Sequence, residues 1–146
     1  MERRTPRATR DNLGFLLAKA AQRWNELLAE RFAREGFAEV RPSYGSLLVP
    51  LFEQDGLRMS QLAARARLSK QTMTTMVRLL ERDGLVLRKP DPADGRATRV
   101  YLTARGRSFE PVAERVLGEL DSLVRTHLSP TDLDRLKATL KGVMSL

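Results

Sequence analysis

The chain has 146 residues, of which 42% are hydrophobic and 30% charged, a composition typical of one folded domain with or without a helical extension. It contains no cysteine and a single histidine, which excludes disulfides, thiol-based redox sensing and histidine-rich metal sites. No apolar run reaches the roughly 18 residues of a membrane span, and no apolar signal sequence follows the basic N-terminus. We therefore expect a cytoplasmic protein without a metal or a cofactor.

The net charge of +8 is concentrated in one part of the chain. Residues 58–107 contain twelve Lys and Arg but only four Asp and Glu, whereas the rest of the chain contains 14 of each sign. A charge that served solubility alone would be spread along the sequence. The concentration therefore indicates a polyanionic partner, either nucleic acid or an acidic membrane surface.

Two segments precede this basic stretch. Residues 1–10 carry four arginines and are expected to form a basic flexible arm, either solvated or in contact with a DNA backbone or a second subunit. Apolar side chains then recur at intervals of three and four residues as far as Phe32, which predicts a long helix with Asp11 or Asn12 as its N-cap. Gly36 is expected to end this helix.

Three shorter helices are expected next. Pro42 stands at a tolerated first-turn position of the first one, and Pro50 should kink that helix or end its regular hydrogen bonding. Ser60 is the predicted N-cap of the second helix and Ser69 that of the third. Apolar residues at i, i+3, i+4 and i+7 from Met73 form one face of the third helix. Two helices separated by three or four residues have the spacing of a helix-turn-helix.

The hydrophobic pattern then changes from helical to extended. Residues 85–89 and 98–102 are predicted to be strands, and the segment between them is rich in Pro, Asp and Gly. A hairpin with a basic tip that follows the second helix of a helix-turn-helix is a wing. Two further helices are expected beyond the hairpin, with Thr103 and Ser129 as their N-caps.

This order of elements predicts a mainly α fold with a small β wing. We assign residues 41–103 to a winged helix-turn-helix and residues 11–40 and 104–146 to helical segments that flank it. The flanking helices carry more apolar residues than a small core can use, and one recognition helix reads too few bases for useful specificity. Both arguments predict a homodimer in which the terminal helices of two subunits pack together. Packing of these apolar faces within one chain is the alternative.

The sequence from Leu57 to Gly106 resembles the MarR (multiple antibiotic resistance regulator) family of transcriptional regulators. The most specific match is Asp94-Gly95-Arg96, because the wing of the family carries an Asp-x-Arg element at this place between two strands. The other matching segments are the stretch that leads into the helix-turn-helix at 57–63, the start of the recognition helix at 69–74, its exit into the wing at 80–86, and the run 102–106.

The match departs from the family pattern at three places. The family often has a basic residue where this chain has Thr75, and an acidic then a basic residue where it has Arg78-Leu79. Pro50 is also unusual for the second helix. Roles in DNA contact are therefore not transferred from the family at Thr75, Arg78 and Leu79.

The resemblance implies a transcriptional regulator that binds a pseudo-palindromic operator in double-stranded DNA. Gln pairs with an adenine edge, Arg with a guanine edge, and Thr offers a methyl or hydroxyl group, so we expect Gln71, Thr72 and Thr75 to read bases. The other polar residues near the helix N-terminus are expected to hold phosphates, because such termini favour anions. These are Ser69, Lys70 and Thr74; Arg78 completes the groove-facing set.

The wing calls for different chemistry. Arg96 at its tip is expected to enter a minor groove, while Arg88, Lys89 and Arg99 neutralise phosphates. Asp94 has the wrong sign for a DNA contact. We expect it to pair with Arg96 or a nearby arginine and so set the geometry of the wing.

The resemblance also implies a mode of control, in which a small aromatic or phenolic molecule binds between the dimer helices and the DNA-binding lobe and relieves repression. Without cysteine, a peroxide-sensing thiol is excluded. Aromatic residues at helical spacing are alternatively plain core residues. The candidates to line an effector pocket are Phe15, Trp24, Tyr44, Phe52 and Arg115.

Three other functions have to be weighed against a DNA-binding regulator. An enzyme finds no support, since the chain lacks a cysteine nucleophile, a phosphate-cradling glycine loop and paired acidic residues in an apolar setting. A membrane-binding amphipathic protein would carry its charge along one helical face, whereas here the charge is spread over a helix and a hairpin. A winged-helix module that binds RNA or a protein is the third alternative.

Overall fold

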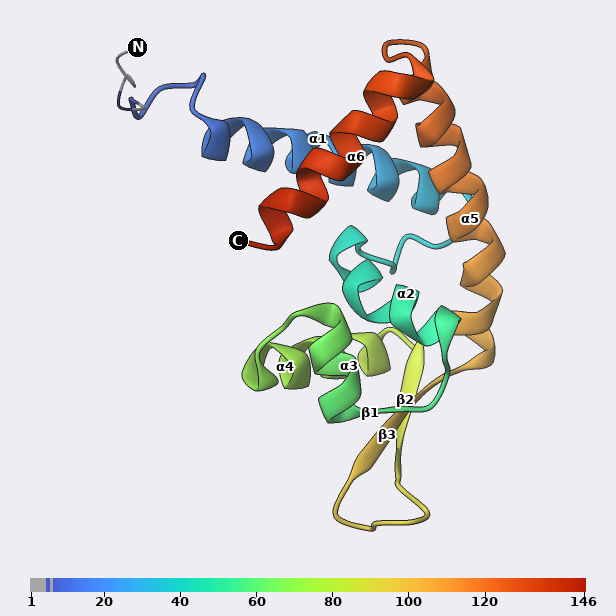
Figure 1. The fold of residues 1–146 in the computed structure, drawn as a ribbon. Helices are drawn as coiled ribbons and strands as arrows, with labels where there is room; N and C mark the ends of the chain where they lie inside the picture. The colour runs from blue at the N-terminus through green and yellow to red at the C-terminus, as the bar shows by residue number, and fades with distance from the viewer. Residues whose placement is uncertain (1–4, 6) are drawn as a thin grey trace.

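The structure, a computed structural model, describes residue 5 and residues 7–146, which form helices and a small antiparallel sheet at one end of the molecule (Figure 1). The predicted fold class, mainly α with a small β wing, is confirmed. Arg7 and Arg10 of the predicted basic arm are exposed, and Arg3 and Arg4 lie outside the described residues. The elements are α1 (Leu13–Arg34), a 3₁₀ turn η1 (Pro42–Tyr44), α2 (Gly45–Glu53), β1 (Leu57–Arg58), α3 (Met59–Ala66), α4 (Lys70–Arg82), β2 (Val86–Pro90), β3 (Thr98–Leu102), α5 (Ala104–Arg125) and α6 (Pro130–Met144).

Four of the predicted helix N-caps are confirmed by their hydrogen bonds. The side chains of Asn12, Ser69, Thr103 and Ser129 each accept from a backbone N–H in the first turn of the helix that follows. Each cap satisfies a backbone donor that has no partner inside the helix, which is why Ser, Thr and Asn stand at these positions.

The prediction of Ser60 as an N-cap is wrong. The helix α3 begins at Met59, so Arg58 is the N-cap residue, and the side chain of Gln61 accepts from the backbone N–H of Arg58 at 3.0 Å. Two constraints fix this start. Arg58 is held extended because it pairs with Arg99 across the sheet, and Gln61 three residues later supplies the acceptor.

The sheet has three strands in the order β1–β3–β2 and is antiparallel throughout. The strand β1 was not expected from the sequence, because two residues are too few to show an alternating pattern. Its Leu57 lies opposite Val100 of β3. The wing strand β2 begins and ends one residue later than predicted, at Val86 and Pro90.

The second predicted helix is divided in the structure. Pro42 begins η1, and α2 follows it from Gly45. Pro50 lies inside α2, which continues for only three more residues, and its carbonyl accepts from Gln54 N–H at 2.9 Å. Proline has no N–H to donate to the carbonyl of Ser46, so the turn before Pro50 lacks one hydrogen bond, while the helix continues past it.

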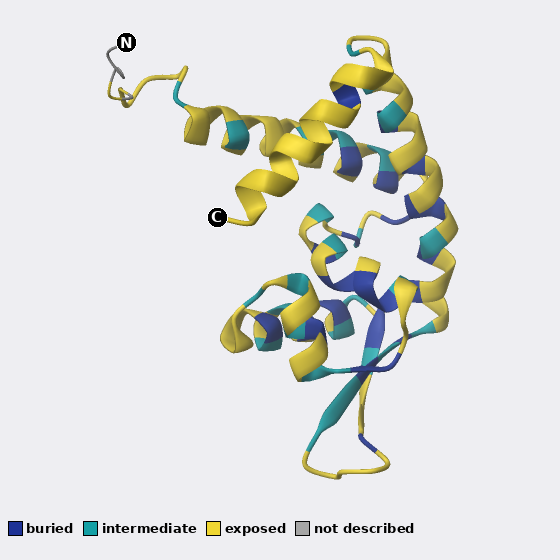
Figure 2. Cartoon of the chain, viewed as in Figure 1, coloured by how far each residue is buried: buried dark blue, intermediate teal, exposed yellow. Residues whose placement is uncertain are grey.

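One hydrophobic core joins the winged helix-turn-helix to the two long helices. Phe109 of α5 lies at its centre, with ring centroids 4.8 Å from Phe32 of α1, 5.2 Å from Phe37 and 6.4 Å from Phe52 of α2. Buried residues line the inner sides of α2 and α5, whereas α6 is exposed over nearly all its length (Figure 2). None of the described helices combines the length and the apolar character needed to span a bilayer.

The close contact between Gly106 and Leu85 fixes how α5 leaves the wing. A Cβ atom built on Gly106 would lie 2.2 Å from the carbonyl oxygen of Leu85, which is a backbone atom that cannot rotate away. The same oxygen accepts from Thr103 N–H at 3.0 Å. Only glycine therefore allows the first turn of α5 to lie directly on the chain that enters β2.

We predict that Gly106→Ala lowers the free energy of unfolding by about 1–3 kcal/mol or more, since forcing extra atoms into a packed site usually costs that much. Gly118 on the same helix is the control, because a Cβ atom added there would meet no atom within 4 Å. Gly118→Ala should therefore leave stability unchanged or raise it by up to about 1 kcal/mol, since alanine favours a helix. Denaturant unfolding followed by circular dichroism measures both; equal stability of the two variants would contradict the packing argument.

Candidate nucleic-acid interface

The helix α4 separates an apolar side from a polar side, as a recognition helix requires. Met73, Val77 and Leu80 are buried in the core. The polar residues that the sequence assigned to a DNA groove lie on the remaining surface, where all are exposed except Thr74, which is half-buried. They are Ser69, Lys70, Gln71, Thr72, Thr74, Thr75 and Arg78.

Two threonine hydroxyls on this surface donate to the helix itself. Thr74 Oγ1 donates to the carbonyl of Lys70 at 3.0 Å, and Thr75 Oγ1 to that of Gln71 at 3.2 Å. A hydroxyl that has given its proton to the backbone can still accept a hydrogen bond, and its neighbouring methyl group stays available. Thr75 is therefore suited to contact a thymine methyl group or an exocyclic amine of a base.

The wing presents Arg96 without a carboxylate partner among the described residues. The loop that carries it is a turn in which Asp94 Oδ1 accepts from Arg96 N–H at 3.0 Å, and the carbonyl of Asp94 accepts from Ala97 N–H at 3.0 Å. We expected Asp94 to pair with an arginine side chain, and this is corrected: its described contact is with the backbone of Arg96. Short acidic side chains favour such local turns.

Within the wing, the carboxylate that pairs with arginine side chains is Asp91, which was not predicted from the sequence. Its Oδ2 accepts from Arg58 Nε at 2.7 Å and from Arg99 Nε at 3.0 Å, and its Oδ1 accepts from Ala93 N–H at 2.8 Å. The Ala93 N–H, and then the two arginines, hold the pKa of Asp91 below its ordinary value. Its partners are 33 and 8 residues away along the chain, so no local pattern could have pointed to it.

The structure divides the basic residues of segment 58–107 into two groups. Six of the twelve lie within 4.0 Å of a carboxylate: Arg58, Arg82, Arg88, Arg99, Arg105 and Arg107. The other six form no ion pair with a described residue: Arg65, Arg67, Lys70, Arg78, Lys89 and Arg96. Two of the predicted phosphate ligands thus belong to the paired group, since Arg88 contacts Glu81 at 2.6 Å and Arg99 contacts Asp91.

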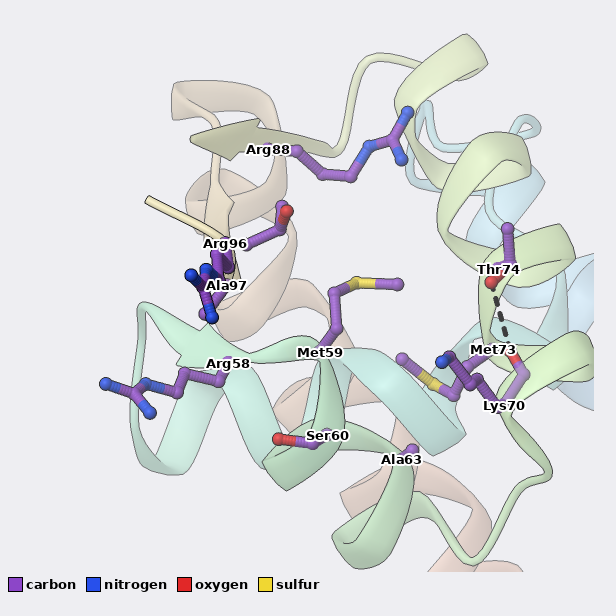
Figure 3. A pocket seen from close by; sticks show the side chains of 11 residues that line it. Arg58, Met59, Ser60, Ala63, Lys70, Met73, Thr74, Arg88, Arg96 and Ala97 are labelled. Atoms are coloured by element: carbon purple, nitrogen blue, oxygen red, sulfur yellow. Dashed lines mark hydrogen bonds between the residues drawn. The ribbon is translucent and has the colours of Figure 1, made fainter. Parts of the chain in front are cut away.

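Between the wing, α3 and α4 the surface is hollowed into a cavity of about 550 Å³. In Figure 3, Lys70 and Thr74 of α4 face Arg96 and Ala97 of the wing across this hollow. Arg58 and Arg88 also line it, and Met59 and Met73 form its apolar floor. A concave surface bordered by cations from three elements has the shape and charge to follow the edge of a polyanion.

The five residues expected to line an effector pocket lie in separate surroundings. Tyr44 is fully buried and donates from its hydroxyl to Asp83, and Phe52 packs on Phe109 of the core. Trp24 is half-buried against the same core. On the outside, Lys19 lies 5.7 Å from the ring of Phe15, and Arg115 pairs with Glu35 at 2.6 Å.

The hydrogen bond between Tyr44 and Asp83 ties η1 to the end of α4. Burial, and then the carboxylate, raise the pKa of the Tyr44 hydroxyl, while Arg82 holds the pKa of Asp83 below its ordinary value. Both groups therefore keep their usual neutral-pH forms, a neutral phenol and a charged carboxylate, which together make a strong hydrogen bond.

The model of the MarR family matches residues 42–98, which contain the helix-turn-helix and most of the wing. The HTH-type transcriptional repressor Rv2887 of Mycobacterium tuberculosis is 34% identical over 95 residues, which cover 65% of this chain and 68% of the repressor. The chain belongs to the MarR family. Its family and relatives are transcriptional regulators, not enzymes.

Two solved structures share the fold of this MarR-family chain. The transcriptional repressor CouR bound to a 23-mer DNA duplex is 22% identical, with a TM-score of 0.79 over 95% of this chain and 99% of its own. The regulator PcaV from Streptomyces coelicolor, in complex with its natural ligand, is 19% identical, with a TM-score of 0.79 over 97% and 98%. At these identities the likeness concerns the fold.

The division into paired and unpaired cations gives a prediction for this MarR-family protein. Arg96→Ala should weaken binding to a random-sequence duplex and flatten its salt dependence, because a cation that enters the minor groove also releases counterions, and the slope of log K against log salt falls by about 0.9 for each phosphate charge no longer neutralised. Arg82→Ala removes the same charge from a residue already paired with Asp83 and should leave the slope nearly unchanged. Fluorescence anisotropy at four salt concentrations measures both slopes. If the slope fell equally in both variants, pairing with a carboxylate would not determine which arginines contact DNA.

Proposed function

We propose that this protein is a homodimeric repressor that binds a pseudo-palindromic operator in double-stranded DNA and releases it when a small aromatic molecule binds. The observation that carries the proposal is the single face on which the polar side of α4, the tip of the wing and the unpaired cations Lys70 and Arg96 meet. The repressor Rv2887 and the DNA-bound repressor CouR support it as a relative and as a fold neighbour.

The operator contacts follow from the side-chain chemistry of α4. Gln71, Thr72 and Thr75 read base edges in the major groove, where one good bidentate pair discriminates by about 1–3 kcal/mol. Ser69, Lys70 and Thr74 hold phosphates at the N-terminus of the helix. Two-fold symmetry places the second copy of α4 about 34–36 Å away, in the next major groove on the same side of the duplex.

The apolar surface of the terminal helices supports a dimer. One chain exposes 10344 Å², whereas a compact monomer of 16.5 kDa exposes about 7,600 Å². We propose that a second copy of the chain packs α1, α5 and α6 against their counterparts and so covers part of this surplus. The exposed large apolar residues on these helices include Leu13, Leu16, Leu117, Leu123, Leu136, Leu140 and Val143.

The proposed effector binds where the terminal helices meet the DNA-binding lobe, close to Trp24 and Phe52. Both are half-buried against the core and so lie at its border. Phe15, Tyr44 and Arg115 complete the proposed set. The complex of PcaV with its natural ligand supports the idea that this fold accommodates a ligand. A regulator acts where the DNA is, and relatives such as Rv2887 of Mycobacterium tuberculosis and YkoM of Bacillus subtilis come from bacteria, so the proposed compartment is the cytoplasm.

Selection of duplexes from a random library tests the proposed function. We expect the wild-type protein to enrich a two-fold symmetric sequence and to bind it at least about 10³-fold more tightly than random duplex, as specific regulators do. The same selection with Gln71→Ala should lose preference at the positions that Gln71 contacts. Enrichment of no sequence, with uniformly weak binding, would refute the proposal; enrichment of structured RNA instead would favour the RNA-binding alternative.

The dimer is tested by charging its proposed interface. Leu140→Glu on α6 should convert the dimer to a monomer at micromolar concentration, because it places a carboxylate in a surface that is to be buried. Val49→Glu is the matched control, since Val49 is similarly exposed but lies on α2. Sedimentation velocity measures both. A wild-type monomer, or a dimer unaffected by Leu140→Glu, would contradict this part of the proposal.

A further inference from the structure

Asp91 is the one buried charged residue among those that the structure describes, with 3% of its surface exposed. It directly follows β2 and so stands where the hairpin becomes the loop of the wing. A buried carboxylate is costly unless its charge is paired and its oxygens accept hydrogen bonds. The contacts of Asp91 therefore show which interactions offset the cost of burying its charge.

These contacts join three separate parts of the wing base. Through Oδ2 the carboxylate accepts from Arg58 of β1 at 2.7 Å and from Arg99 of β3 at 3.0 Å. Through Oδ1 it accepts from Ala93 N–H at 2.8 Å, and its own N–H donates to the Ala97 carbonyl at 2.9 Å, which closes the loop. Arg99 also donates to the carbonyl of Gly56 at 2.8 Å, beside β1.

Among the described residues, the tip of the wing has no other support of this kind. Figure 1 shows the loop between β2 and β3 extending away from the helices, with only the base of the hairpin beside β1. The direction of the loop is therefore decided at its base. Arg96 stands within this loop, and the bond from its N–H to Asp94 fixes only the local turn.

We propose that Asp91 is a positioning residue for DNA binding, which holds the wing so that Arg96 meets the DNA in register with α4. This inference rests on the proposed function and names the residue that sets the position of the wing on the specific site. Asp91 itself makes no contact with the DNA. It acts through Arg58, Arg99 and the loop backbone.

The sign of one substitution separates positioning from simple electrostatics. Removing a negative charge from a DNA-facing surface strengthens binding to any duplex if only the field of the protein matters. Removing the anchor of the wing weakens binding to the specific site, because Arg96 and α4 no longer engage together. Asp91→Asn removes the charge while keeping a side-chain oxygen for Ala93 N–H, so the two effects oppose each other directly.

The experiment compares Asp91→Asn with Asp94→Asn in the full-length protein. The control removes the same charge from the same loop, and its amide oxygen can still accept from Arg96 N–H. Each variant is titrated with the duplex that the wild type selects and with random duplex of equal length. We expect Asp91→Asn to bind the selected duplex at least tenfold more weakly and the random duplex as well as the wild type or better. We expect Asp94→Asn to lose neither.

Hydrogen exchange on the DNA-free proteins supplies an independent measurement. Exchange in residues 92–99 should be faster in Asp91→Asn, while the core helices and the thermal midpoint stay close to those of the wild type. The inference is overturned if Asp91→Asn binds the selected duplex as tightly as Asp94→Asn does. It is also overturned if Asp91→Asn binds both duplexes more weakly by the same factor and unfolds at a lower temperature, since Asp91 would then stabilise the whole fold and not the wing in particular.

Failure of the proposed function has a different signature. If the wild type selects no sequence, the regulator proposal fails before any variant is compared. The exchange measurement then decides the role of Asp91 alone: unchanged exchange in residues 92–99 overturns its role as the anchor of the wing.

Discussion

The constraint on which this structure depends is the self-repulsion of its basic segment. Twelve cations within fifty residues repel one another unless many of them are neutralised by carboxylates of the same chain. The chain meets this constraint by pairing half of them with carboxylates, among them Asp91, which is buried, and Asp55, which also accepts from Leu102 N–H at the base of β3. Of the paired arginines, Arg58 and Arg99 join β1 and β3 through Asp91, and the unpaired cations remain for a polyanion.

Close packing also links the DNA-binding lobe to the terminal helices. Gly106 sets the start of α5 against Leu85, and Phe109 one turn later enters the core beside Phe32 of α1. Further along, Arg115 pairs with Glu35 of α1. The two long helices are thus fastened to the winged helix-turn-helix over several turns. In the proposed dimer, a change in the angle between the two subunits would therefore move both copies of α4, since each is packed into the same core as the long helices of its own subunit.

Sequence reasoning succeeded where the physics is local and failed where it is not. Helix caps such as Ser69 and Thr103 depend on residues three positions apart, and the amphipathic face of α4 depends on a repeat within one helix. The strand β1 depends instead on pairing with Val100, more than forty residues away, and the buried state of Asp91 depends on Arg58 in another strand. The pairing of Arg99 with Asp91 was not predicted for this reason: the basic character of Arg99 is visible in the sequence, but its partner is not.

The departure of this chain from its family at Thr75 agrees with the separation between cations that bind a polyanion and uncharged residues that contact bases. With its hydroxyl proton given to the Gln71 carbonyl, Thr75 offers the middle of α4 a methyl group and an acceptor, but no charge. On the proposed groove-facing assignment, the first half of α4 then discriminates bases through Gln71 and the methyl group of Thr75. The cations assigned to affinity are Lys70 at the start of α4, Arg78 in its second half and Arg96 on the wing. On this assignment, affinity and specificity reside on different residues. Salt screens the contacts between cations and phosphates but has little effect on hydrogen bonds and apolar contacts to bases. As the salt concentration rises, the affinity for DNA should therefore fall more steeply than the ratio of specific to random binding.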